Sequence, residues 1–556
     1  MKKHIDCLLI GHNDIDFEEY EKKVRAMGVR SGAYRDLDLN FVVLDNRPQT
    51  AADMFNLFYG GDSNGGSPKY PLTTGETFSA TIAYLGTYLH RRGFGFDFVN
   101  SFQEEKEELA LKLSGHSIDL VAITTTLYVS MLPILEIVEF IRKHNPETRI
   151  AVGGPFISTR TRVQDDGALE FMFNSIGADF YVDSSQGEGT LVRLLGALQG
   201  NGNVQDVPNL HYRAGAGYTS TPKVVEDNRL AENMVDWNLF AGRVGDFANL
   251  RTSISCPFSC AFCGFPEHAG HYQVAGIGDI ERELTVLDSV HSLKCVHFID
   301  DTFNVPKQRF KDMLRMMIQR RFTFNWYSHF RCQFADRETV ELMKESGCDG
   351  VFLGIESGSP SVLESMNKQA TAEKYLEGIA LLKEYGITTY GSFIVGFPGE
   401  TEATARETRQ FINSSGLDFF RAQLWYYEPI TPIRRRRERF GLEGESFEWR
   451  HHTMDSATAS DIVDDMFLSS GEPLWVPQYN FECDAIFHLQ HRGLPRRRVK
   501  DFIQAFNRGV REKITGQGRR EIGAETLDDM RRAVCGDIHP QCEPEPIQTM
   551  EADFDF

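Results

Sequence analysis

Residues 253–266 read SISCPFSCAFCGFP and carry three cysteines in a C-x3-C-x2-C pattern. Three thiols are an odd number for disulfides and one short of the four ligands of a closed zinc site. A zinc ion with three protein ligands and water is an open alternative, although such sites usually include histidine or carboxylate. Thiolates also hold iron–sulfur clusters, and a four-iron cluster on three cysteines keeps one iron open to an exchangeable ligand. We therefore predict that Cys256, Cys260 and Cys263 hold a [4Fe-4S] cluster whose open iron is the reactive position.

The cysteines follow the first of six strand-like segments, which alternate with helical ones. The strand-like segments are 249–254, 294–300, 324–330, 350–356, 391–397 and 420–427. Helical periodicity separates most of them, as in 309–320, 339–347 and 375–386. Six βα units form a partial barrel with its chemistry at the carboxyl ends of the strands. We therefore predict a partial (βα)6 barrel over 246–435, with the cysteines at its mouth.

The first 200 residues form a separate alternating series. Strands are predicted at 6–12, 96–102, 119–126, 149–156 and 178–185, with helical segments between them. Continuous apolar runs such as LVAI suit strands covered on both faces. The predicted fold class is therefore α/β, with a doubly wound parallel sheet over 1–205 that is interrupted by an inserted loop at 13–78. Such sheets bind ligands beyond the carboxyl ends of their strands, here residues 124–130, 153–156 and 184–190.

The remaining segments complete the domain prediction. Residues 206–245 are expected to be a hairpin and a linker. Residues 436–556 are expected to be a partly helical C-terminal region, and its acidic end EPEPIQTMEADFDF is expected to be disordered.

Charge and hydropathy narrow the function classes. The chain of 556 residues has a net charge of −20, which disfavours nucleic acid as the main partner, since phosphate contacts need a basic face. Basic runs occur at 433–440 (IRRRRERF) and 494–500 (LPRRRVK), and we favour solvated helix faces over anion sites for both. No apolar run is long enough to span a bilayer, and the N-terminal run is too short for a secretory signal. A cytoplasmic protein without a membrane partner is therefore expected.

The cysteine pattern and its flanks resemble the radical SAM superfamily, in which the open iron binds S-adenosyl-L-methionine (SAM). Phe262 precedes the last cysteine, where the superfamily places an aromatic residue near the adenine. The stretch FIDDTFN (298–304) ends the second strand, where the methionine end of SAM is held. The resemblance therefore implies that Phe262, Asp300 and Asp301 contact SAM.

Three later stretches extend the same resemblance. GIESGS (354–359) places Glu356 and Ser357 where ribose contacts usually arise. GSFIVGFPGET (391–401) is similar to the fifth-strand motif that supports the adenine, which implies contacts from Gly391, Ile394 and Gly396. YEPITPI (427–433) resembles the Pro-Gly-Thr-Pro stretch after the sixth strand, with Ile430 in place of glycine. One electron delivered to the cluster would cleave SAM to methionine and a 5′-deoxyadenosyl radical, and the protein would orient the substrate and exclude water and oxygen.

A doubly wound domain directly before such a barrel resembles the cobalamin-binding subclass of these enzymes. The subclass carries Asp-x-His-x-x-G, then Ser/Thr-x-Leu, then Gly-Gly. The second and third elements match, and a Gly-Glu stretch follows, which implies cobalamin contacts from Thr125, Thr126, Leu127, Gly153, Gly154, Gly187 and Glu188. The first element is missing because His12 is out of frame. The resemblance therefore implies base-off cobalamin without a histidine ligand on cobalt.

The two cofactors together imply methyl transfer from methylcobalamin to an unactivated carbon or phosphorus centre. Residues 447–467 are similar to a group of phosphinate P-methylases and aromatic-acid C-methylases of natural-product biosynthesis, which implies a small-molecule or peptide substrate. Side chains proposed for the substrate pocket are Tyr426, Tyr427, Glu428, His451 and His452. Packing is an equally good interpretation for the tyrosines, and a helix N-cap is one for Asp455.

Two alternative functions are kept. The first retains both cofactors but closes a ring or rearranges the substrate without transferring a methyl group. The second is a non-catalytic corrinoid or iron–sulfur sensor. For the leading function, an electron donor of flavodoxin or ferredoxin type is an expected partner.

Overall fold

The computed structural model describes residues 3–59, 72–73, 77–126, 128–479, 481, 483–516 and 521–536. The chain divides into two compact units. The first is built from residues 1–36 and 74–473, and the second from residues 37–73 and 474–556. All the predicted site residues lie in the first unit.

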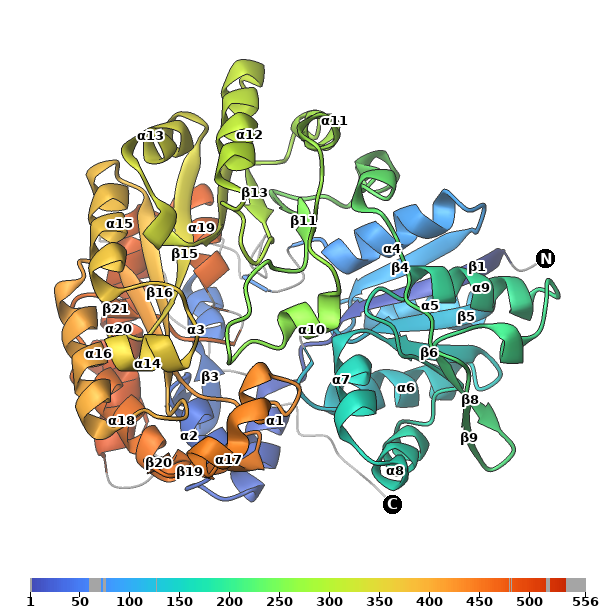
Figure 1. The fold of residues 1–556 in the computed structure, drawn as a ribbon, viewed down its shortest axis with the longest axis horizontal. Coiled ribbons are helices and arrows are strands. Elements are labelled where there is room, and N and C mark those ends of the chain that lie inside the picture. Colours follow the sequence, from blue (N-terminus) through green and yellow to red (C-terminus); the bar gives the residue numbers. More distant parts are fainter. Residues whose placement is uncertain are drawn as a thin grey trace. The chain divides into compact units, whose positions relative to one another are not determined.

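The first half of unit 1 is a twisted sheet in the strand order β4-β1-β5-β6-β7-β8-β9 (Figure 1). The strands are β1 (His4–His12), β4 (Phe96–Ser101), β5 (Ser117–Thr124), β6 (Arg149–Gly153), β7 (Phe180–Val182), β8 (Leu210–Ala214) and β9 (Gly217–Ser220). Strands β4, β1, β5, β6 and β7 pair in parallel, and β8 and β9 continue the sheet as an antiparallel hairpin. The parallel strands run in the flavodoxin-like order 2-1-3-4-5, which confirms the predicted doubly wound fold.

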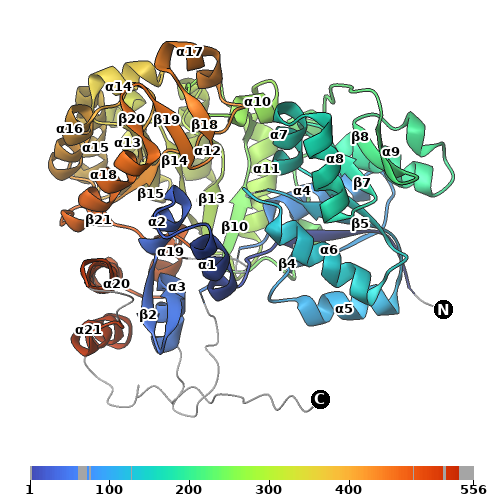
Figure 2. The same cartoon turned by 90° about the horizontal axis from the view of Figure 1, so that it is seen from below.

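Helices cover both faces of this sheet (Figures 1 and 2). Helices α4 (Ala80–His90) and α9 (Glu188–Leu198) contact each other and the strands from one side. On the other side, α6 (Leu132–His144) packs between α5 (Lys106–Gly115) and α8 (Asp166–Ile176). The apolar run of β5 is buried from Leu120 to Ile123, as expected for a strand covered on both faces.

The second half of unit 1 is the predicted partial barrel, with parallel strands in the order β10-β13-β14-β15-β16-β17. Its strands are β10 (Phe247–Leu250), β13 (Cys295–Phe298), β14 (Asn325–Phe330), β15 (Cys348–Glu356), β16 (Thr388–Val395) and β17 (Phe419–Leu424). The connecting helices include α11 (Ile277–Asp288), α12 (Lys307–Arg320), α13 (Arg337–Glu345), α14 (Pro360–Ser365), α15 (Ala372–Glu384) and α16 (Glu402–Ser414). Apolar side chains on one face of each helix are buried against the strands, which is why the alternation was readable in the sequence.

The expected inserted loop at 13–78 is wrong for its described part. This part holds α1 (Phe17–Ala26), α2 (Gly32–Asp38), the hairpin β2 (Phe41–Leu44) and β3 (Arg47–Thr50), and α3 (Ala51–Phe58). Capping residues stabilise two of these helices: Asp16 accepts from the Glu19 amide, and Thr50 and Asp53 form a capping box. Residues 60–71 and 74–76, which belong to the predicted loop, lie outside the described part.

The predicted C-terminal region is divided between the two units. Residues up to 473 belong to unit 1 and form α17 (Arg437–Phe440), the small sheet β18 (Glu443–Glu445), β19 (Glu448–His451) and β20 (Met454–Asp455), and α18 (Ser456–Leu468). Unit 2 combines β2, β3 and α3 with β21 (Leu474–Trp475), α19 (Cys483–His491), α20 (Arg496–Thr515) and α21 (Ala524–Cys535). The acidic tail expected to be disordered lies outside the described residues. Among the described helices, none combines the length and apolarity needed to cross a membrane.

Candidate active site

The three cysteines lie on one loop at the mouth of the barrel. The loop leaves the short strand β11 (Ser253–Ile254) and ends at α10 (Phe265–Ala269). A positive φ of 67° at Ser255 turns the chain immediately before Cys256. All three thiols are free; Cys260 is buried, whereas Cys256 and Cys263 are partly exposed. The three predicted ligands therefore lie on one short segment at the carboxyl end of the first barrel strand.

Asp300 anchors the start of this loop. Its carboxylate accepts hydrogen bonds from the amides of Thr252 (2.9 Å) and Ser253 (2.5 Å), and from their hydroxyls (2.6 and 2.8 Å). The side chain is buried, with 2% of its surface exposed. Both oxygens are thus engaged by the loop, so Asp300 is placed as a positioning residue. The neighbouring Asp301 is exposed as a whole residue. Desolvation of its carboxyl group by nearby protein atoms, together with the negative charge of Asp300, raises the pKa of Asp301 to about 7.

Cationic side chains lie beside the thiols. Burial raises the pKa of the Cys260 thiol, and the positive charges of Lys368 and Arg331 act in the opposite direction. Lys368 Nζ is 3.1 Å from Glu356 Oε1 and 5.4 Å from the centre of the Phe262 ring. The predicted contacts Phe262 and Glu356 are therefore neighbours at the mouth, joined by a lysine that the sequence interpretation did not single out.

The other predicted SAM residues divide into two groups. Ser357 is fully buried, and its Oγ lies 2.9 Å from Thr408 Oγ1 of α16. Gly391 is buried, and a Cβ there would come within 2.6 Å of Leu417, so packing accounts for this glycine. Ile394 is partly exposed near the carboxyl end of β16, and the Gly396 amide that follows donates to Glu400 (2.5 Å). Ile394, Gly396 and Ser357 thus lie near the carboxyl ends of their strands, with Ser357 buried against α16, whereas Gly391 lies within β16 and packs against Leu417.

The predicted corrinoid residues gather at the carboxyl edge of the doubly wound sheet. The amide and hydroxyl of Thr125 both donate to the Gly153 carbonyl (2.9 Å each). Gly154 has a φ of 113°, and a Cβ there would lie 2.8 Å from Thr125 Oγ1. Thr126 is exposed, 3.3 Å from Thr81 Oγ1. These residues form a tight cradle without bulky side chains at the carboxyl ends of β5 and β6; Leu127 lies outside the described residues.

Gly187 and Glu188 have a different setting, at the start of α9. Gly187 has a φ of 80°. Glu188 is buried and accepts from Asn228 Nδ2 (2.8 Å) of the linker, and burial raises its pKa to about 7. Glu226, also from the linker, accepts from the Gly189 amide (2.7 Å) and thereby caps this helix N-terminus. The Gly-Glu stretch is thus packed against the linker.

The predicted substrate-pocket residues are mostly structural. His451 is buried, and its Nε2 lies 3.1 Å from the Gly396 carbonyl, so it supports the end of β16. His452 is exposed. Tyr427 is buried against Trp425 (5.1 Å between ring centres), and the Tyr426 hydroxyl accepts from Ser446 Oγ (3.3 Å). Asp455 caps α18 by accepting from the Thr458 amide (2.8 Å), in agreement with the N-cap interpretation.

Glu428 is the exception, because it faces a polar junction between the barrel mouth and the sheet. A Cβ on Gly264 would lie 3.6 Å from Glu428 Oε2 and 3.7 Å from His268 Nε2. Burial raises the pKa of Glu428, while the charge of Arg160 on α7 (Pro155–Val163) opposes this shift. Glu428 and His268 therefore lie on either side of Gly264, at the end of the cysteine loop.

His268 is a candidate functional residue that sequence reasoning missed. Its Nε2 is 3.1 Å from Thr159 Oγ1, whose own hydroxyl proton goes to the Pro155 carbonyl (2.9 Å). His268 must therefore donate through Nε2, which leaves Nδ1 as an acceptor. This atom is buried and has no hydrogen-bond partner among the described residues, and burial together with Arg162 lowers the pKa of His268 to about 4. No spacing rule marks His268, since its partner lies 109 residues away.

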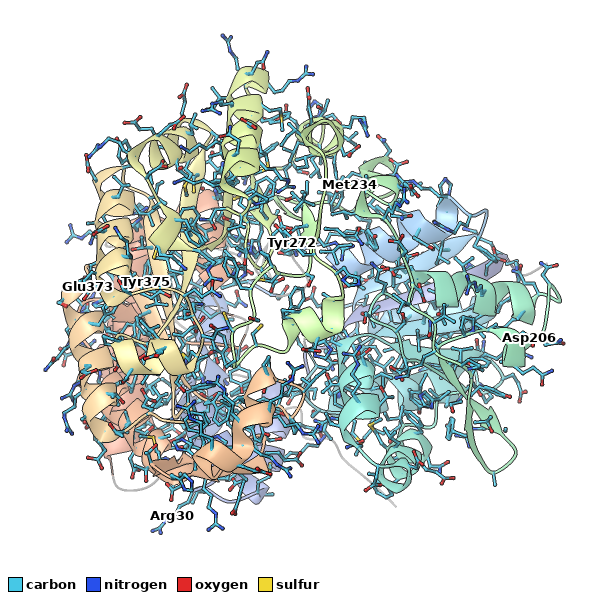
Figure 3. The ribbon with its side chains drawn as sticks, in the orientation of Figure 1. Arg30, Asp206, Met234, Tyr272, Glu373 and Tyr375 are labelled. Carbon is cyan, nitrogen blue, oxygen red and sulfur yellow. The ribbon has the colours of Figure 1, made fainter. Side chains whose placement is uncertain are left out.

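Tyr272 is a second missed residue (Figure 3). It follows α10, and its hydroxyl donates to the Val305 carbonyl (2.6 Å), so it fastens the chain after the cysteine loop to the loop after β13. Burial raises the pKa of Tyr272 to about 12.

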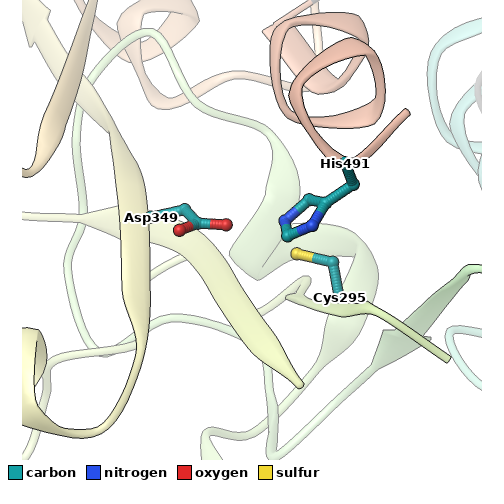
Figure 4. Close-up of side chains that lie close together, drawn as sticks. All are labelled: Cys295, Asp349 and His491. Atoms are coloured by element: carbon teal, nitrogen blue, oxygen red, sulfur yellow. The ribbon is translucent and has the colours of Figure 1, made fainter. Parts of the chain in front are cut away.

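The opposite end of the barrel has a different character. Cys295 is the first residue of β13, and Asp349 is the second residue of β15 (Figure 4). Asp349 accepts from Asn325 Nδ2 (2.6 Å) at the start of β14. Cys295 is fully buried, as expected for a packed thiol. The cysteine loop thus lies at the carboxyl ends of the strands, where barrel chemistry takes place.

The residues present fit the implied cofactors. Three free thiols on one loop, with the charges of Lys368 and Arg331 acting on Cys260, suit an anionic iron–sulfur cluster with one open iron. The Glu356–Lys368 pair and the Phe262 ring offer polar and aromatic contacts next to it for SAM. The close approach of Gly154 to Thr125 leaves a smooth edge that suits a flat macrocycle.

Comparisons with known proteins agree with this geometry. Residues 250–412 match the family model of the Radical SAM superfamily. An uncharacterized methyltransferase of Pyrococcus horikoshii is 25% identical over 356 residues, which cover 62% of this chain and 75% of that protein. The anaerobic magnesium-protoporphyrin IX monomethyl ester cyclase of Cereibacter sphaeroides is 24% identical over 460 residues, covering 77% and 71%.

A solved structure extends the likeness over both halves of unit 1. The radical S-adenosylmethionine methyltransferase TsrM from Kitasatospora setae, with cobalamin and a [4Fe-4S] cluster bound, aligns with a TM-score of 0.59 at 17% identity. The alignment covers 82% of this chain and 96% of that chain, which shows a shared fold. With the cysteine loop at the barrel mouth and the family match over the same residues, residues 250–412 are a radical SAM domain, and the protein is an enzyme that carries it beside a doubly wound α/β domain.

Proposed function

We propose that this protein is a cobalamin-dependent radical SAM methyltransferase that transfers a methyl group to an unactivated carbon or phosphorus centre of a small molecule or peptide. The observation that carries the proposal is that one compact unit contains two candidate cofactor-binding regions. One is the three-thiol loop at the barrel mouth, and the other is the Thr125–Gly154 cradle of the sheet. An enzyme that uses both cofactors on one substrate needs both regions close to it.

Residues of this chain would hold the cofactors as follows. Cys256, Cys260 and Cys263 would ligate the cluster, and Phe262 and Glu356 would contact SAM. Thr125, Gly153 and Gly154 would approach the corrinoid. When bound, the cluster and SAM would supply a carbon-centred radical, and cobalamin would supply the methyl group.

The chain's own residues hold the two regions together. The Thr159–His268 hydrogen bond joins α7 of the sheet domain to α10 of the cysteine loop, and Arg162 of α7 donates to the Glu267 carbonyl. Burial of this junction would also keep water away from a reactive intermediate.

A second candidate function is cyclisation or rearrangement without methyl transfer. The specific observation in its favour is the similarity to the cyclase of Cereibacter sphaeroides, which covers 77% of this chain. Product mass separates the two functions, since methylation adds one methyl group and cyclisation does not.

The test is anaerobic reconstitution with iron, sulfide and hydroxocobalamin, followed by absorption spectroscopy and electron paramagnetic resonance. Wild type should bind one corrinoid and a four-iron cluster, without nitrogen splitting from a lower histidine ligand, and should cleave SAM upon reduction. The Cys256→Ala/Cys260→Ala/Cys263→Ala variant should lose the cluster and retain the corrinoid. Absence of corrinoid binding would contradict the proposal, and absence of SAM cleavage would support the sensor alternative.

A further inference from the structure

The basic run at 433–440 lies against the cysteine loop. The Ile433 amide donates to the Ala261 carbonyl (2.9 Å), between Cys260 and Cys263. Arg435 lies 3.7 Å from Glu267, on the helix that ends the same loop. Arg436 donates to the Ser365 carbonyl (2.7 Å) of the neighbouring α14. The run therefore contacts the cysteine loop, the helix that ends this loop, and α14.

The arginines of this run face solvent. Arg434, Arg435, Arg437 and Arg439 are exposed, and 79% of the Arg435 side chain is accessible. Residues 434–439 hold five arginines and one glutamate, a net charge of +4, in a chain whose net charge is −20. We name the exposed Arg434, Arg435, Arg437 and Arg439 the arginine patch. An acidic protein would be repelled by most of this molecule and attracted here.

The cluster loop itself reaches the surface, since Pro257 and Ser259 are exposed and Cys256 and Phe258 are partly exposed. A redox partner at the arginine patch would therefore lie next to the part of the chain that holds the cluster. The proposed function requires one electron per SAM cleaved, and the structure contains no donor of its own among the described residues.

We propose that the arginine patch is the docking surface for an acidic one-electron donor protein. This inference rests on the proposed function, because only reductive cleavage of SAM requires an electron donor. In the transfer, the donor is oxidised by one electron, the oxidised cluster is reduced by one, and no covalent bond changes. Charge complementarity speeds association and orients the donor, and it weakens as salt screens the charges.

The experiment compares a patch variant with a matched control in the full-length protein. The patch variant is Arg434→Ser/Arg435→Ser/Arg437→Ser. The control is Arg320→Ser/Lys344→Ser/Lys383→Ser, which removes three exposed cations at the carboxyl ends of α12, α13 and α15. Helices of a βα barrel run from the mouth towards the opposite end, so these cations lie away from the cysteine loop.

The first readout is the dissociation constant for an acidic flavodoxin, measured by calorimetry on protein without cofactors at several salt concentrations. Each exposed charge pair contributes a few tenths to 1 kcal/mol, so the patch variant should bind about tenfold more weakly at low salt. Its binding should also depend less on salt, and the control should bind like wild type. An Arg→Lys triple variant at the same positions should retain binding, because the patch acts through charge.

The second readout is 5′-deoxyadenosine formation in reconstituted protein, driven either by reduced flavodoxin or by dithionite. With flavodoxin at a sub-saturating concentration, the patch variant should form 5′-deoxyadenosine about tenfold more slowly than wild type. With dithionite, the two proteins should form it at the same rate. Unchanged flavodoxin binding by the patch variant would overturn the docking proposal. Loss of affinity for transfer RNA with unchanged flavodoxin binding would overturn it in favour of a nucleic-acid surface. If wild type does not cleave SAM with dithionite, the proposed function is wrong. The binding measurement still shows whether the arginine patch binds an acidic flavodoxin through its charge.

Discussion

Several buried carboxyl groups of unit 1 have pKa values raised by burial. Glu188, Glu283 and Glu400 are all buried, and burial raises their pKa values to about 7, 8 and 7. Glu283 of α11 accepts from Trp237 Nε1 (2.8 Å), and its second oxygen has no hydrogen-bond partner among the described residues. A protonated carboxyl fits this setting better than a charged one.

The pH dependence of stability should therefore include a contribution from Glu283. Between pH 4.5 and about 8 the unfolded chain releases this proton while the folded chain keeps it, so the free energy of unfolding falls as pH rises. Glu283→Gln keeps the acceptor for Trp237 and removes the charge. The variant should be more stable than wild type at pH 8 by about 4 kcal/mol, and within about 1 kcal/mol of wild type at pH 5. Urea unfolding at both pH values measures this difference. Glu345→Gln, at an exposed position, should leave the dependence intact, and equal slopes for wild type and Glu283→Gln would contradict the assignment.

At the scale of elements, the turn from β6 to α7 depends on Gly154. Its φ of 113° disfavours other residues, and a Cβ would come 2.8 Å from Thr125 Oγ1 and 3.1 Å from the Thr125 amide nitrogen. Gly28 provides a matched control, because its φ is 114° and a Cβ there would meet nothing within 4 Å.

The two alanine variants should separate backbone strain from close approach. Gly28→Ala should cost about 1 kcal/mol of stability for its backbone alone. Gly154→Ala should cost about 1–3 kcal/mol more, because the added methyl group overpacks the β5–β6 edge. Denaturant unfolding of protein without cofactors measures both, independently of corrinoid binding. Equal losses in the free energy of unfolding for Gly28→Ala and Gly154→Ala would show that a methyl group at Gly154 meets no close contact from Thr125.

Elements were also where the sequence was most informative. Short apolar runs and helical patterns predicted the barrel strands and the doubly wound sheet, because parallel strands are covered on both faces and the helices are buried on one face. Local patterns do not show which of two adjacent aspartates turns towards the cysteine loop, so Asp300 and Asp301 were given the same role. They also do not show that Thr159 meets His268, since that hydrogen bond forms only after both domains have folded. The elements at 17–58 were missed although the Thr50–Asp53 capping box marked one of them.

At the scale of the whole molecule, unit 1 is stabilised by contacts between residues that are far apart in the sequence. Asp36 of α2 pairs with Arg421 of β17 at 3.4 Å, 385 residues further along. The Arg421 side chain is fully buried, and only 14% of the Asp36 side chain is exposed. Burial raises the pKa of Asp36, and Arg421 opposes that shift. The N-terminal segment is thereby fixed to the last strand of the barrel.

Breaking this pair from one side should cost more than replacing it. Asp36→Asn removes the negative charge that faces the buried Arg421 guanidinium and should lower the free energy of unfolding by about 3 kcal/mol. The double variant Asp36→Leu/Arg421→Met removes both charges and should regain most of that loss, since apolar side chains of similar size need no counter-charge. Denaturant unfolding of the wild type, Asp36→Leu, Arg421→Met and the double variant measures the coupling. Additive effects would mean that the two residues act independently, and the tie between the N-terminal segment and the barrel would then reside in apolar packing, such as that of Gly32 against Leu424.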